Sequence, residues 1–194
     1  YLAVQMNNPK YPGSPYVVFS SLQQNNLPGY DGRRKTRDMI TWYKESTIRK
    51  PNVRKIWVQA RVDSEFEQLD DLIISRTLFP RFNSISAYIN YFSITLTAFF
   101  VSITGVLLGR WWYGFMIADT VNLHYVNNLK GKHLAEEYFF NNSNPFYKPM
   151  WTYEVEKSNR LISLFFYSTN NELLVFNDYK LNGWSYQIMK WKRY

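Results

Sequence analysis

Residues 84–109 read SISAYINYFSITLTAFFVSITGVLLG, and this stretch decides the predicted fold. It lies in a window without a charged side chain, between Arg81 and Arg110. About 25 helical residues at 1.5 Å per residue extend about 37 Å, enough to cross a hydrocarbon core of about 30 Å with some tilt. We therefore predict one transmembrane helix over residues 84–109. The alternative is a buried core helix of a soluble domain, but such helices are usually shorter.

Both ends of this stretch carry side chains that are typical of a membrane–water interface. Aromatic rings favour the headgroup region, and arginine side chains reach toward it from the ends of a span. The predicted membrane-interface residues are Arg81, Tyr88, Tyr91, Arg110, Trp111 and Trp112.

One face of the predicted helix is lined by small residues. Ala98, Ser102, Gly105 and Gly109 are spaced i, i+4, i+7 and i+11, and the two glycines form a G-x-x-x-G pair. Small side chains let another helix approach closely within a membrane. We therefore predict a helix-packing face here, and hence partner helices in the membrane.

The composition narrows the class of protein. A mean hydropathy of −0.38 over 194 residues excludes a polytopic carrier. The net charge of +8 leaves nucleic acid, anionic lipid and an acidic protein as partners. Nucleic acid is not expected, because the basic residues are spread along the chain and the run Arg33–Arg37 is more typical of a solvated face. The absence of cysteine excludes disulfides, thiolate metal sites and cysteine nucleophiles.

Residues 1–83 are predicted to form an extended N-terminal arm followed by amphipathic helices. Prolines are frequent near the start of the chain, and each removes a backbone donor. Further on, Val53, Ile56, Trp57 and Ala60 fall at i, i+3, i+4 and i+7, which lines one helical face. The pattern predicts a helix over residues 53–79.

The chain after the span is predicted to change from helix to strand. Residues 110–145 are expected to continue as a helix that leaves the membrane. Within 146–194, three runs of strand-forming residues are separated by turn signals such as Asn182-Gly183. The predicted fold class is a mainly α membrane protein with one transmembrane helix, an extended N-terminal arm and a small C-terminal antiparallel β-meander.

The sequence contains no recognisable catalytic or cofactor motif. No P-loop, dinucleotide-binding, H-E-x-x-H or G-x-S-x-G pattern occurs. His124 and His133 are nine residues apart and cannot share a metal ion on one helix. His133, Glu136 and Glu137 have the spacing of metal ligands on one helical face. An ion pair at the surface is the expected role of this last group. We predict no catalytic, cofactor-binding or metal-ligating residue, no cofactor and no enzymatic activity.

This layout, a single span in a basic chain with aromatic-rich arms, resembles the supernumerary subunits of mitochondrial respiratory-chain complexes and of ATP synthase. The start of the chain at Tyr1 rather than Met fits such a processed protein. The resemblance implies an accessory subunit of a respiratory-chain complex in the mitochondrial inner membrane, with other subunits and lipid, including anionic lipid, as partners. The alternatives are an accessory subunit of ATP synthase, a membrane-tethered enzyme or electron carrier, and a membrane-tethered ribosomal subunit.

Overall fold

The structure, a computed structural model, describes residues 9–22, 27–28, 38–60, 70–129, 131–141, 148–165, 175–176 and 179–180. Its helices are α2 (Met39–Glu45), α3 (Ile85–Leu107), α4 (Trp112–Leu129), the 3-10 turn η3 (Gly131–His133) and α5 (Trp151–Lys157). Its strands are β1 (Tyr16–Phe19), β2 (Lys55–Gln59), β3 (Leu72–Ser75), β4 (Glu137–Asn141), β5 (Leu161–Phe165), β6 (Val175–Phe176) and β7 (Tyr179–Lys180).

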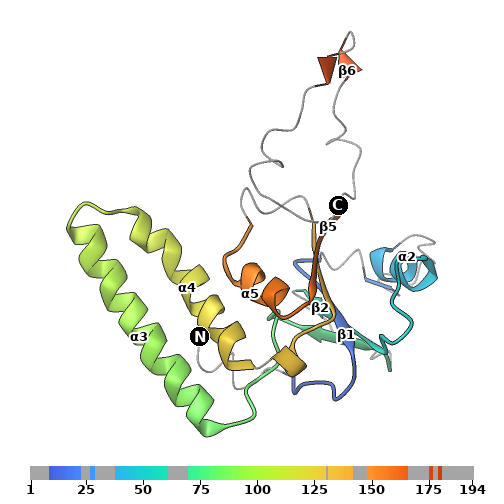
Figure 1. Ribbon diagram of the computed structural model, residues 1–194, viewed down its shortest axis with the longest axis horizontal. Coiled ribbons are helices and arrows are strands. Elements are labelled where there is room, and N and C mark those ends of the chain that lie inside the picture. The colour runs from blue at the N-terminus through green and yellow to red at the C-terminus, as the bar shows by residue number, and fades with distance from the viewer. Residues whose placement is uncertain are drawn as a thin grey trace.

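The centre of the molecule is a five-stranded sheet in the order β3-β2-β1-β4-β5 (Figure 1). Every neighbouring pair in it runs parallel. The β1 strand, Tyr16-Val17-Val18-Phe19, is buried along its whole length. A parallel sheet covered on both faces favours such continuous apolar strands, because neither face meets water.

Successive side chains of β1 contribute to two separate cores. Val17 and Phe19 pack on the face that carries α2, where Ile40 and Tyr43 of that helix are buried. Tyr16 and Val18 pack on the opposite face, which is covered by α4 and α5 (Figure 1). Since alternate side chains of a strand point to opposite faces, the result is a three-layer α/β arrangement.

The crossover from β3 to β4 is a long antiparallel hairpin of two helices, α3 and α4. The α4 helix lies between α3 and α5, so that α3 is the outermost element of this layer (Figure 1). Tyr125 of α4 fixes the hairpin to the chain that precedes it, because its hydroxyl donates to the Pro80 carbonyl at 2.6 Å.

A buried ion pair secures the start of α5. The Lys148 ammonium lies 2.7 Å from a Glu156 carboxylate oxygen, with the two side chains 1% and 9% exposed. The same ammonium lies 4.6 Å from the centre of the Tyr153 ring. Charges removed from water this far require a partner, so the pair holds the segment that precedes α5 against the helix itself.

The predicted fold class is wrong. The helix at the centre of the apolar stretch is present as α3, but the protein is built on a parallel sheet rather than being mainly α with a single span. The predicted N-terminal arm contributes β1, the central strand, and the predicted helix over 53–79 is replaced by β2 and β3. Strands buried on both faces lack the alternation of apolar and polar residues that would reveal them in the sequence. Both segments became strands because they pair with strands elsewhere in the chain.

The predicted C-terminal antiparallel meander is also wrong. Its first run forms β5, which pairs in parallel with β4 and so completes the main sheet. Antiparallel pairing in the described part of this region is limited to the short strands β6 and β7. The third predicted run, residues 184–191, lies outside the described residues.

Candidate functional site

The α3–α4 hairpin carries the largest apolar surface among the described residues. Between Phe82 and Ala118 the only charged residue is Arg110. The exposed apolar side chains are concentrated where the two helices meet, and we define the apolar tip as Leu107, Leu108, Trp111 and Phe115, each 65–79% exposed. Exposed apolar surface of this extent marks a contact with a membrane or another molecule.

The apolar surface continues from the tip along the outer side of α3. Exposed side chains recur along the whole helix: Ile85, Ile89, Phe92, Leu96, Phe99, Phe100 and Ile103. Only 11% of the most apolar window of α3 is buried, and its mean hydropathy is 1.5. By length and composition α3 is the one described helix able to cross a membrane.

The predicted packing face of α3 lies against α4 of the same chain. The Ser102 hydroxyl donates to the Tyr113 carbonyl at 3.0 Å, and Gly105 is buried beneath the Tyr113 ring. A Cβ added at Gly105 would lie 2.0 Å from Tyr113 Cδ2, so only glycine allows this approach. Ala98 is partly buried in the same core, whereas Gly109 lies in the turn after α3 with φ +81°.

The predicted interface residues fall into two groups at opposite ends of α3. Arg110, Trp111 and Trp112 lie at the exposed tip. Tyr91 is buried at the base of the hairpin, where its ring contacts Tyr125 with centroids 5.2 Å apart. The remaining two, Arg81 and Tyr88, line a pocket beside that base. One of the two groups of predicted interface residues is therefore partly inside the protein.

Sheet topology places both ends of the hairpin on the same side of any membrane. The strand before it, β3, and the strand after it, β4, belong to one sheet. In addition, Asp119 on α4 is buried and accepts a hydrogen bond from the Met150 backbone N–H at 3.4 Å, which joins α4 to the segment before α5. Burial raises the pKa of the Asp119 carboxyl. Because both ends of the hairpin join one sheet, α3 cannot be a single span with folded regions on opposite sides of a membrane.

A second candidate site lies at the carboxyl edge of the sheet, where β1 and β4 are neighbours but their connections leave in opposite directions. Ser20 and Ser21 follow β1 directly, and Ser21 adopts a left-handed conformation with φ +55°. Their hydroxyls lie 3.3 and 3.4 Å from Gln59 Oε1 at the end of β2. Small polar groups that follow β1 and end β2 thus meet at the carboxyl edge, beside the topological switch point between β1 and β4. The segments 61–69 and 142–147, which follow β2 and β4, lie outside the described residues.

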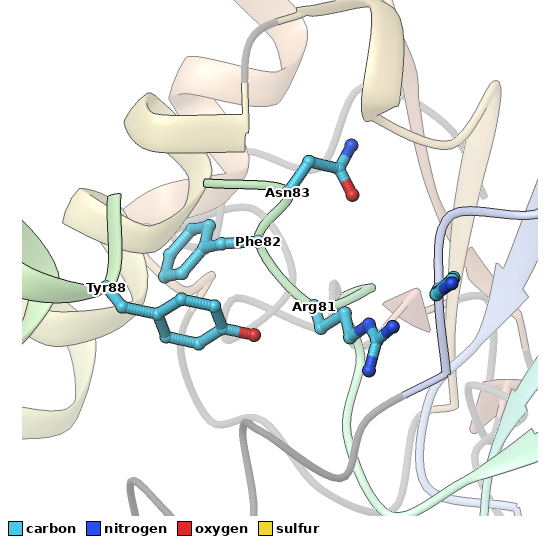
Figure 2. A pocket seen from close by; sticks show the side chains of 5 residues that line it. Arg81, Phe82, Asn83 and Tyr88 are labelled. Atoms are coloured by element: carbon cyan, nitrogen blue, oxygen red, sulfur yellow. The ribbon is translucent and has the colours of Figure 1, made fainter. Parts of the chain in front are cut away.

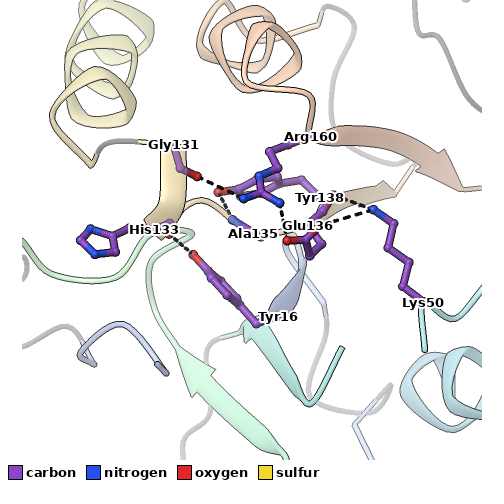
Figure 3. A network of polar contacts seen from close by, with 8 residues as sticks. All are labelled: Tyr16, Lys50, Gly131, His133, Ala135, Glu136, Tyr138 and Arg160. Atoms are coloured by element: carbon purple, nitrogen blue, oxygen red, sulfur yellow. Dashed lines mark hydrogen bonds and ion pairs between the residues drawn. The ribbon is translucent and has the colours of Figure 1, made fainter. Parts of the chain in front are cut away.

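The opposite, amino edge of the sheet carries a polar network (Figure 3). Arg160 pairs with Glu136, and the Lys50 ammonium lies 3.9 Å from the other carboxylate oxygen of Glu136. Tyr16 donates to the His133 carbonyl at 2.8 Å, while Tyr138 accepts from the Ala135 N–H at 3.2 Å. Burial raises the pKa of the Tyr16 hydroxyl and raises the pKa of Tyr138 to about 12. Every member bonds within the network, so its role is to join β4 and β5 to the rest of the fold.

The histidine and carboxylate group considered from sequence is dispersed by the fold. His133 lies in η3, Glu136 pairs with Arg160, and Glu137 accepts from the Ser163 hydroxyl inside the sheet. His124 lies on α4. Among the described residues no three His, Asp or Glu side chains gather as a metal site would require.

Fold and surface together define a parallel α/β protein with a protruding apolar helical hairpin. Residues 94–194 match the family described as polysaccharide biosynthesis PFTS motif proteins. The match covers just over half of the 194 residues, and the chain belongs to this family. A literal Pro-Phe-Thr-Ser tetrapeptide does not occur in the sequence. No curated protein and no solved structure matches the chain significantly.

Proposed function

We propose that this chain takes part in polysaccharide biosynthesis at a membrane surface, where the carboxyl edge of its sheet binds a nucleotide-activated sugar. The observation that carries the proposal is the switch point between β1 and β4 in a member of a polysaccharide-biosynthesis family. Open parallel sheets bind ligands outside the carboxyl ends of their strands at this point. By analogy with such folds, a nucleotide is the ligand expected at this edge.

The described part of this edge offers uncharged hydrogen-bonding groups. Ser20 and Ser21 carry hydroxyls, and Gln59 carries an amide that orders them. The N-terminus of α2 is already capped by Asp38, whose carboxylate accepts from the Thr41 N–H at 2.8 Å, so phosphates are not expected there. The serine hydroxyls and the Gln59 amide suit the hydroxyls of a sugar or the edge of a base better than a pyrophosphate.

The α3–α4 hairpin attaches the sheet domain to one leaflet. The apolar part of α4, from Trp112 to Ala118, extends about 10 Å before the buried Asp119, within the hydrocarbon depth of one leaflet, about 15 Å. A hairpin that enters obliquely would place the apolar tip in the leaflet and the outer side of α3 in the interface, as amphipathic membrane-surface helices do.

Ligand-observed NMR on the full chain bound to vesicles tests the sugar-nucleotide site. Uridine and guanosine diphosphate sugars should show saturation transfer, and Ser21→Asn should weaken binding at least about tenfold, because the longer side chain occupies the edge while asparagine tolerates the left-handed backbone. Asn159→Ser is the matched control, since Asn159 has φ +57° at the amino edge before β5. Binding of no sugar nucleotide, or equal loss in both variants, would contradict the proposal.

The role expected from the resemblance, an accessory subunit of a respiratory-chain complex or of ATP synthase in the mitochondrial inner membrane, stays a prediction. The layout on which it depended, a single span between separate arms, is replaced by a hairpin whose two ends return to one sheet. The expectation of no enzymatic activity likewise stays a prediction.

A further inference from the structure

A basic pocket lies at the base of the hairpin, where the chain passes from β3 into α3 (Figure 2). Lys10, Arg81, Phe82, Asn83 and Tyr88 line a space of about 440 Å³. The N-terminal segment reaches this position because the Arg81 backbone N–H donates to the Pro9 carbonyl at 3.1 Å. The pocket therefore joins two segments that are about seventy residues apart in the sequence.

The lining of the pocket is suited to an anion. Lys10 and Arg81 supply two positive charges, and none of the described residues that line the space is acidic. Within the part of the chain that the structure describes, neither cation forms an ion pair. The Asn83 amide and the Tyr88 hydroxyl add donors, and Figure 2 shows the Tyr88 hydroxyl directed toward the side that Arg81 lines. A phosphate with several acceptor oxygens matches this donor set.

The N-terminus of α3 is not itself the binding group. Its first free N–H groups are partly satisfied by Ser84, whose hydroxyl accepts from the Ala87 N–H at 3.3 Å. The positive end of the helix dipole adds to the field in the pocket, but the charges of Lys10 and Arg81 are what select an anion there.

One residue of the pocket lining, Tyr88, lies on α3 near the start of that helix. Ile85 and Ile89, three residues before and one residue after Tyr88, are 78% and 65% exposed. A molecule with a phosphate in the pocket can therefore lay an apolar chain along these side chains. Phe82 closes the inner wall, since its ring packs against Tyr125 with centroids 4.1 Å apart.

We propose that this pocket binds the phosphomonoester head group of an anionic membrane lipid, with the lipid's apolar chain against Ile85 and Ile89. The inference rests on the membrane attachment proposed above, because only an interfacial hairpin brings the pocket to the headgroups. The pocket adds a specific phosphate site to a hairpin that would otherwise bind the bilayer through apolar contact alone. In polysaccharide biosynthesis, a lipid phosphate held here would lie at the foot of the same hairpin that anchors the domain.

Vesicle partition of the full chain tests this proposal. Wild-type protein should bind phosphatidylcholine vesicles that contain phosphatidic acid at least about tenfold more tightly than pure phosphatidylcholine, since each basic group near the surface is worth roughly 1 kcal/mol. Lys10→Gln with Arg81→Gln should abolish the preference and leave binding to pure phosphatidylcholine unchanged. The matched control, Arg49→Gln with Lys157→Gln, removes equal charge from two exposed positions and should keep the preference.

The outcomes separate this inference from the attachment itself. Failure to bind pure phosphatidylcholine contradicts the membrane attachment. Binding there without a preference for phosphatidic acid, or a preference that the pocket variant keeps, overturns the phosphate site alone. Complete competition by millimolar inorganic phosphate would assign the pocket to a soluble phosphate and overturn the lipid assignment.

Discussion

Removal of three of the four side chains of the apolar tip should strongly weaken membrane binding without harm to the fold. Leu107, Leu108 and Phe115 are 79%, 76% and 74% exposed. Transfer of a fully exposed side chain of this kind out of water stabilises by about 1.5–3 kcal/mol, so three side chains that are each about three-quarters exposed contribute roughly 3.5–7 kcal/mol. Replacement of all three by serine should therefore lower the partition coefficient onto phosphatidylcholine vesicles by between about 300-fold and 10⁵-fold.

The assay is a flotation or fluorescence titration of purified chain against vesicles, with urea unfolding measured on the same proteins. The stability in buffer should change by less than about 0.5 kcal/mol per substitution, because exposed side chains contribute little to folding. Trp42→Ser is the matched control, since Trp42 is 46% exposed on α2, across the sheet from the hairpin. Undiminished partition of the triple variant, or an equal loss in the control, would refute the reasoning.

Three further predictions concern the fold. Gly105→Ala should destabilise the hairpin by about 1–3 kcal/mol in urea unfolding through overpacking, whereas Gly114→Ala, whose Cβ would meet its nearest neighbour at 3.7 Å, should be neutral or stabilising; equal effects would contradict the close approach. Tyr138 has a folded pKa of about 12 against about 10 when unfolded, so its contribution, about 2–3 kcal/mol, is complete below pH 10 and is lost between pH 10 and 12. The urea midpoint of unfolding should therefore fall less between pH 9 and 11 in Tyr138→Phe than in wild type. Equal decreases in the two proteins would contradict this role of Tyr138. Lys148→Met should cost about 3–5 kcal/mol, and adding Glu156→Leu should restore most of it; additive losses would show that the buried pair is not coupled.

The sequence predicts the apolar helix well and the sheet poorly. The stretch without charge between Arg81 and Arg110 predicts α3 from composition alone, because a helix forms its hydrogen bonds within its own segment. In contrast, β1 pairs with β2 and β4, which lie about forty and one hundred and twenty residues further along the chain. Its two buried faces remove the alternation that marks a strand, and the prolines near it indicate an arm.

The candidate sites likewise combine a feature that is visible in the sequence with contacts that only the fold creates. The small-residue face is visible in the sequence, but its partner is α4 of the same chain, because a turn at Gly109 reverses the helix. Nothing local indicates that Ser20 and Gln59 meet at one edge, since the two are brought together by parallel pairing of separate segments. The basic pocket has the same origin: Lys10 and Arg81 become neighbours through a single backbone hydrogen bond from residue 81 to Pro9.

The side of the membrane on which the two flanks of the hairpin lie tests the central claim most directly. The chain has no cysteine, so Thr47→Cys, before the hairpin, and Lys157→Cys, after it, each provide a single exposed label site. In sealed native membrane vesicles of one orientation, a membrane-impermeant maleimide should label both positions alike, and Leu108→Cys should label only after detergent is added. Labelling of Thr47→Cys and Lys157→Cys from opposite sides would contradict the hairpin and restore a transmembrane span.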